Sequence, residues 1–175
     1  MKFIGIALFF FTVCLAQADL LISGINFGDG RDDVTKKLQK SQVVKSEVPP
    51  TMLTRVGLNG SFKTVNALKG KKFLLYFNWS DADSLDELTF RSTAYNTASY
   101  NTQLKSLWNS AIQLLSSIHG KTQNAGEYPN ASLLKNGGIR FSHEWQTNDG
   151  FIYLGTGKEN GEVHLIITFS KEKMT

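Results

Sequence analysis

The sequence predicts an α+β fold, in which one antiparallel sheet carries helices on one of its faces. Residues 98–119 carry a broad apolar stripe with a helical period. Short segments whose side chains alternate in polarity lie before and after that stretch, as expected for half-buried strands. The elements follow the order helix then strands, twice over, and such an order packs helices against one antiparallel sheet.

A first helix is expected over residues 29–41. Asp29 suits the N-cap position, and the two aspartates of the following turn lie where the helix dipole favours carboxylates. Val34 and Leu38, four residues apart, form a short apolar stripe on this helix.

The rest of the first half predicts strands. Pro49 and Pro50 make residues 47–51 extended or turning. Strands are expected over 62–65, 71–79 and 85–93, with a polar turn between the last two.

The second half begins with the strongest helix signal, over 98–119, and Gly120 is a natural terminating residue. Residues 121–138 are mostly polar and are expected to form a loop. Turn residues then separate three expected strands, at 139–146, 151–154 and 162–170.

The two halves, about 19–95 and 96–175, resemble each other within a single domain spanning 19–175. A shift of 66 residues places Trp79 on Trp145 and Leu88 on Leu154, and the apolar period survives the shift. A duplication explains this pattern. The alternative is that any two helix-and-hairpin units can be slid into agreement.

Alternation sorts the strand residues into two faces. The face toward the helices is expected to carry Phe73, Leu75, Phe77, Leu88, Phe90, Ile139, Phe141, Ile152, Leu154, Val163, Leu165, Ile167 and Phe169. The opposite, open face is expected to carry Tyr76, Arg91, Arg140, Glu144, Phe151, Tyr153 and His164. A face that mixes aromatic and charged residues suits protein recognition, in which Tyr and Arg are favoured anchors. The alternative is an ordinary solvated sheet face.

The first 18 residues have the pattern of a secretory signal peptide. Lys2 precedes an apolar run from Phe3 to Leu15, and Ala16-Gln17-Ala18 fits a cleavage site after Ala18. The run falls short of the roughly 20 residues that a membrane-spanning helix needs. We therefore expect a periplasmic or secreted protein.

The remaining composition narrows the function classes. The only cysteine, Cys14, lies in this leader, so the cleaved chain has neither disulfides nor cysteine chemistry. The net charge of +4 is spread without a basic stripe, which argues against nucleic-acid binding. No later apolar stretch could insert stably in a membrane. Three N-x-S/T triplets, at Asn59, Asn78 and Asn130, are weak evidence for a eukaryotic glycoprotein, whereas a secreted chain without cysteine is more usual in bacteria.

No motif for catalysis or metal binding stands out. His143-Glu144 begins like the H-E-x-x-H zinc motif, but Thr147 replaces its last histidine and the segment has a strand pattern. There is no G-x-S-x-G nucleophile elbow. A carboxylate pair for glycoside hydrolysis would have to come from Glu87, Glu127 and Glu144. No metal or other cofactor is predicted.

One segment resembles known families. Ile25-Asn26-Phe27-Gly28, followed by Asp33-Val34 and Leu38, is similar to the opening of the SmpA/OmlA outer-membrane assembly lipoproteins and of the secreted β-lactamase inhibitor proteins. The resemblance implies a duplicated helix-plus-sheet plan. The chain departs from the lipoproteins in having Val13 before Cys14, where a lipidation site needs a small residue, and from the inhibitors in lacking disulfides.

Together these features favour an exported bacterial, non-enzymatic module that recognises another protein through its open sheet face. Two alternatives remain at this point. One is an envelope hydrolase that acts on cell-wall or polysaccharide material, and the other is an inhibitor or immunity protein.

Overall fold

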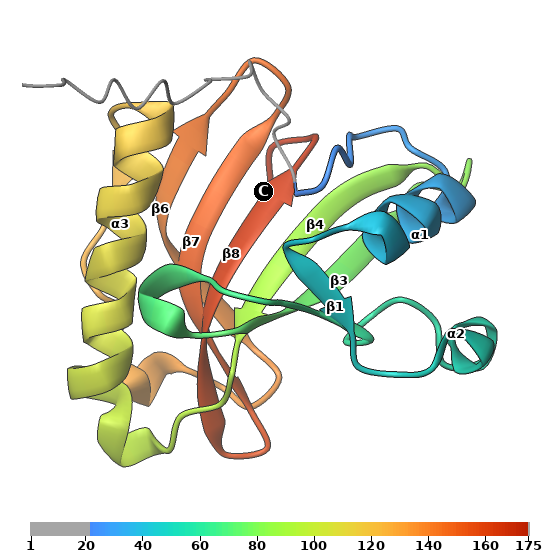
Figure 1. Cartoon of the computed structure of the whole chain (residues 1–175). Coiled ribbons are helices and arrows are strands. Elements are labelled where there is room, and N and C mark those ends of the chain that lie inside the picture. Colours follow the sequence, from blue (N-terminus) through green and yellow to red (C-terminus); the bar gives the residue numbers. More distant parts are fainter. Residues whose placement is uncertain (1–21, 175) are drawn as a thin grey trace, which may run out of the picture.

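The computed structural model describes residues 22–174, so the predicted signal peptide and Cys14 lie outside the described residues. The fold is α+β, with eight antiparallel strands in the order β1-β2-β3-β4-β8-β7-β6-β5. Figure 1 shows α3 beside one end of this sheet and α1 with α2 beside the other. The strands are β1 (Val44–Ser46), β2 (Phe62–Thr64), β3 (Phe73–Trp79), β4 (Leu85–Ser92), β5 (Asn124–Ala125), β6 (Ile139–Gln146), β7 (Phe151–Glu159) and β8 (Glu162–Ser170). The α-helices are α1 (Arg31–Lys40), α2 (Pro50–Val56) and α3 (Lys105–His119).

The main strands and helices confirm the predictions, except that the strand expected at 151–154 continues to Glu159. The short elements β1, β5 and α2 were missed. Strands β1 and β5 have three and two residues, too few to show alternation. The segment expected to be extended or turning at 47–51 leads into α2, whose first residue is Pro50. Proline is well tolerated there because the first turn of a helix needs no backbone donor.

The start of α1 differs in detail from the prediction. Gly30 is the N-cap, and no side chain caps the helix. Asp29 instead accepts hydrogen bonds from the backbone nitrogen of Asn26, at 2.7 Å, and from the Lys37 ammonium, at 2.6 Å. It therefore ties the entry loop to the helix surface. Val34 and Leu38 form the buried stripe as predicted.

The long helix was predicted correctly over nearly its whole length. A 3₁₀ turn, η2 (Thr97–Ser99), and a π-helical turn, η3 (Tyr100–Leu104), lead directly into α3. The helix ends at Gly120, whose φ of 79° places it in the region that favours glycine.

The strand order is symmetric about the sheet centre. Strands β4 and β8, the last of each half, pair with each other. Phe90 pairs with Ile167, and the flanking pairs are Thr89 with Thr168 and Arg91 with Ile166. This order places β3 opposite β7, whereas the 66-residue shift matched β3 with β6, so the strand order does not follow that alignment.

The core is divided into two clusters on the same side of the sheet. The α3 cluster is built around Trp145, Tyr100 and Leu165, and the α1 cluster around Phe62, Leu75 and Leu88. Only partly buried side chains, chiefly Phe90 and Phe169, contact both clusters. The helix layer is therefore discontinuous over the centre of the sheet.

Candidate binding face

The sheet side away from the helices, called here the outer face, carries six of the seven predicted site residues. They form two groups separated by β8. Tyr76, Arg91 and His164 lie over β3, β4 and β8, and Glu144, Phe151 and Tyr153 lie over β6 and β7. The outer side chains of β8 between these groups, Ile166 and Thr168, are almost completely buried.

Arg91 organises the first group. Its guanidinium lies 4.3 Å from the centroid of the Tyr76 ring, donates a hydrogen bond to the Tyr76 hydroxyl and forms an ion pair with Glu159. Burial raises the pKa of the Tyr76 hydroxyl, and the positive charge of Arg91 opposes that rise. Because Glu159 already neutralises its charge, Arg91 mainly holds Tyr76 and Glu159 together across the strands.

His164 has a structural role within the same group. Its Nδ1 donates to the backbone oxygen of Ser92, at 2.9 Å, and the ring is buried. The neighbouring backbone nitrogen of Leu165 donates to the Ser92 hydroxyl, also at 2.9 Å. These bonds hold the end of β4 against β8.

The C-terminal segment covers the second group. The Lys173 ammonium lies 3.1 Å from a Glu144 carboxylate oxygen and 5.9 Å from the centroid of the Phe151 ring. The backbone nitrogen of Met174 donates to the Tyr153 hydroxyl, at 2.9 Å. Glu144 and Tyr153 are therefore buried, while Phe151 is only partly covered.

A β-bulge in β6 overturns three predicted orientations. The register of β6 on β7 shifts between Phe141 and His143. Ile139 and Phe141 therefore lie on the outer face, not toward the helices as predicted. Arg140 pairs with Thr156, whose hydroxyl contacts Tyr100 on the helix side, so the outer-face prediction for Arg140 was also wrong.

Gly155 in β7 makes room for this bulge, because a Cβ there would overlap the backbone oxygen of Arg140. Glycine inside a strand often marks a bulge or a close backbone approach. Gly155 was therefore the sequence signal that the strict alternation overlooked. A Cβ on the next glycine, Gly157, would meet only side-chain ends, 3.5 Å from Ile139 and 3.3 Å from Ile166.

The bulge creates an apolar row on the outer face, called here the outer strip, formed by Ile139, Phe141, Tyr153 and Phe151. The Phe141 and Tyr153 rings are 5.3 Å apart, and Tyr153 stacks on Phe151 at 6.4 Å. Ile139 and Phe141 are 49% and 38% exposed, although both are large apolar side chains.

The geometry does not assemble a hydrolytic carboxylate pair from Glu87 and Glu144. These residues lie on β4 and β6, with β8 and β7 between them. At about 4.8 Å per strand spacing, they are separated by about 14 Å, beyond the separations of roughly 5–9.5 Å that glycosidases use. Burial raises the pKa of Glu87, but its Oε1 accepts a hydrogen bond from Thr89 at 3.0 Å, within its own strand. Over residues 22–174, no three acidic, histidine or cysteine side chains gather into a metal site.

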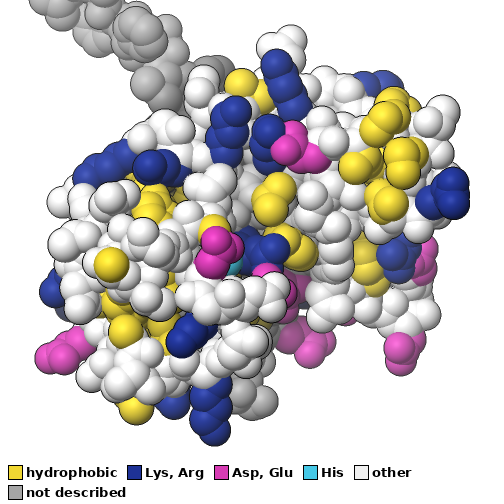
Figure 2. All heavy atoms as spheres, turned by 90° about the horizontal axis from the view of Figure 1, so that it is seen from below, with side chains coloured by type: hydrophobic (Ala, Val, Ile, Leu, Met, Phe, Trp, Pro, Cys, Tyr) yellow, Lys and Arg dark blue, Asp and Glu magenta, His cyan; other side chains and the backbone are white. Residues whose placement is uncertain are grey.

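The charged side chains on the face seen in Figure 2 do not favour a partner of either charge. Figure 2 shows Lys and Arg interspersed with Asp and Glu over the lower face, without a continuous basic stripe. Within the described range, no helix is both long and apolar enough to cross a membrane.

Comparison with protein-family models, curated proteins and solved structures gives no significant match. The resemblance to exported assembly and inhibitor proteins therefore stays a prediction, and the function must be argued from the geometry.

Proposed function

We propose that the chain is an exported, non-enzymatic module that recognises another protein through the outer strip. The observation that carries the proposal is the bulge in β6, which turns Ile139 and Phe141 from the helix side to the outer face. Bulges recur beside functional sites because they re-aim side chains.

The energetics make this arrangement hard to explain by stability alone. Full burial of a large apolar side chain contributes about 1.5–3 kcal/mol. Strict alternation would have turned Ile139 and Phe141 toward the helix side, whereas the bulge leaves both exposed on the outer face. A protein partner that covers the strip would recover that stabilisation on binding.

The surroundings of the strip match the anatomy of a protein interface. Aromatic side chains occupy its centre, and charged groups flank it: the Lys173–Glu144 pair at one end and the Arg91–Glu159 pair across β8. An apolar centre with a polar rim is the usual composition of such contacts. The leader, if cleaved after Ala18, would place this surface in the periplasm or outside the cell.

Quantitative capture from the native envelope or secretome tests the proposal. The bait variants are Phe141→Ser and a control, Leu133→Ser, which alters an exposed apolar residue on the separate turn η4 (Ala131–Leu133). We expect the wild type and the Leu133 variant to retain one stoichiometric partner, and the Phe141 variant to lose it at least tenfold. Equal recovery by all three baits, or no stoichiometric partner, would contradict the proposal.

A further inference from the structure

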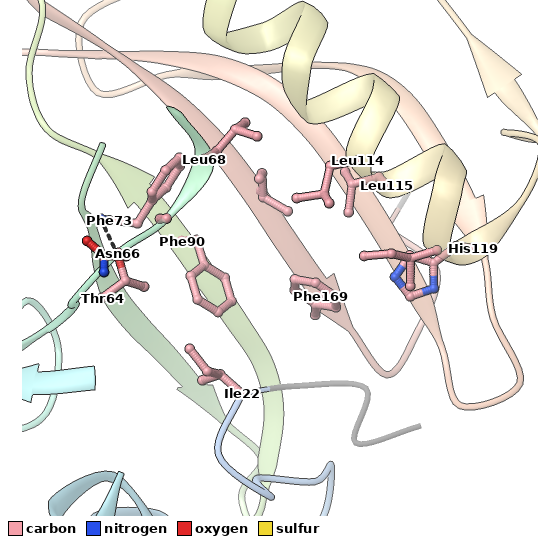
Figure 3. A pocket seen from close by; sticks show the side chains of 13 residues that line it. Ile22, Thr64, Asn66, Leu68, Phe73, Phe90, Leu114, Leu115, His119 and Phe169 are labelled. Atoms are coloured by element: carbon pink, nitrogen blue, oxygen red, sulfur yellow. Dashed lines mark hydrogen bonds between the residues drawn. The ribbon is translucent and has the colours of Figure 1, made fainter. Parts of the chain in front are cut away.

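The helix side of the sheet contains a groove of about 370 Å³ that the outer-face proposal does not use. Figure 3 shows its floor, in which Phe73, Phe90 and Phe169 lie on three neighbouring strands, β3, β4 and β8. The C-terminal half of α3 forms one wall. The segment 64–68, which follows β2, forms the opposite wall.

This groove lies where the two core clusters meet. Phe90 and Phe169 pack edge to face, with their centroids 5.7 Å apart, yet both remain only partly buried. On the α3 wall, Leu114 and Ile118 are 44% and 63% exposed. Apolar side chains from both walls and from the floor are therefore left incompletely covered in one concave place.

Polar groups in the groove are few and sit at its rims. The Thr64 hydroxyl accepts a hydrogen bond from the backbone nitrogen of Phe73, at 3.0 Å. Asn66 and His119 lie on opposite walls, as Figure 3 shows, and neither side chain is hydrogen-bonded to another described residue. Burial lowers the pKa of His119, which favours the neutral imidazole near pH 7.

The dimensions of the groove suit a small molecule. Its volume of about 370 Å³ falls within the range of small-molecule pockets, about 300–1,000 Å³.

The lining also restricts the charge of that molecule. Among the described residues that line the groove there is no Lys, Arg, Asp or Glu, so a charged head group would be desolvated there without a countercharge. Asn66 and His119 can each donate or accept one neutral hydrogen bond. We propose that the groove binds a small neutral amphiphile, with its hydrocarbon part on the phenylalanine floor and a hydroxyl or amide head at the His119 rim.

The neutral fluorescent probe N-phenyl-1-naphthylamine, displaced by 1-decanol or by decanoate, tests the site. The variant Ala67→Phe fills the groove from the 64–68 wall, and Phe141→Ser on the outer strip is the control. We expect saturable binding to the wild type and the control, and at least tenfold weaker binding to Ala67→Phe. Near-ultraviolet circular dichroism verifies that each variant is folded.

A second pair of measurements tests the head group. At pH 7.4, 1-decanol should displace the probe at lower concentration than decanoate, and His119→Leu should reduce displacement by 1-decanol while leaving the affinity for the probe unchanged. Absence of saturable probe binding, or equal binding by a folded Ala67→Phe variant, would overturn the site. Stronger displacement by decanoate would overturn the neutral head group. Because the outer strip is unaltered in Ala67→Phe, these results are independent of partner capture.

Discussion

The outer strip and the groove are two apolar surfaces on opposite sides of one sheet, and they arise in different ways. The strip comes from a local irregularity, because one bulge turns Ile139 and Phe141 outward. The groove comes from the layout of the whole fold, because α1 and α3 cover the two ends of the sheet and leave its centre uncovered. A single substitution can therefore alter the outer strip, whereas the groove depends on how the helices are placed on the sheet.

The largest effect is expected where the strip is created. Gly155→Ala places a Cβ against the backbone of Arg140. Strand β6 must therefore change its register on β7 or separate from it. We expect a loss of about 3 kcal/mol in the free energy of unfolding, measured by urea denaturation.

Gly157→Ala is the matched control for that change. Its Cβ would meet only the flexible ends of Ile166 and Ile139, at 3.3 and 3.5 Å. The expected loss is below about 1 kcal/mol. Equal losses in the two variants would show that the bulge does not depend on Gly155, and the origin proposed for the strip would be wrong.

These glycines also show how far the sequence could predict the molecule. The period of residues 98–119 and the alternation in β3, β4 and β8 were enough to predict the sheet and its long helix, because burial on one face dictates those patterns. A bulge inserts one residue and reverses every orientation beyond it. Alternation therefore failed for Ile139, Arg140 and Phe141 in a single step, although the strand itself was predicted correctly.

The groove lay beyond sequence reasoning for a different reason. Phe90 and Phe169 have the patterns of ordinary core residues, and both were expected to face the helices. Whether interior side chains are fully covered depends on the spacing between α1 and α3, which no local pattern encodes. The seven site residues were predicted on the assumption that charged and aromatic side chains on the outer face are exposed. Three of them, Glu144, Tyr153 and His164, are instead buried.

A second pair of variants separates the stability roles of the two surfaces. Phe90 contacts both core clusters, so Phe90→Ala should reduce the free energy of unfolding by about 2 kcal/mol. Phe141 lies on the exposed strip, and Phe141→Ala should cost about 1 kcal/mol or less. Urea denaturation of both variants under the same conditions measures the difference. A larger loss for Phe141 would mean that the strip is a structural element and not a binding surface.

The pH dependence of the unfolding free energy depends on one histidine beside each surface, His143 behind the strip and His119 at the groove. His143 lies behind the strip, with its ring 5.1 Å from Trp108 and 5.8 Å from Trp145, and burial lowers its pKa below the ordinary 6.5, as it does for His119 at the groove. Well above pH 6.5 the two imidazoles are neutral in both the folded and the unfolded chain, so the free energy of unfolding has its full value. Below pH 6.5, the unfolded chain binds protons that the folded chain does not, and stability falls.

Unfolding free energies measured from pH 7.5 to 5.5 should therefore decrease as pH falls. His143→Gln and His119→Gln should each make this decrease shallower, and the double variant should nearly abolish it above pH 6. A slope that is unchanged in the double variant would show that these two imidazoles do not titrate differently in the folded and unfolded states.

The smallest effect is expected at the end of the strip covered by the C-terminal segment. Lys173 is mostly exposed, so water can replace its ammonium beside Glu144, and Lys173→Ala should cost less than about 1 kcal/mol in unfolding free energy. Removing this contact should loosen the segment over Tyr153 and accelerate nitration of its ring by tetranitromethane, followed by mass spectrometry. Lys171→Ala, in the same segment, is the control, because the backbone nitrogen of residue 171 donates a hydrogen bond to the Asp86 carbonyl oxygen, which the substitution keeps. A loss above about 2 kcal/mol would mean that the segment is an integral part of the outer face. Equal nitration in both variants would mean that the Lys173 contact does not hold the segment over Tyr153.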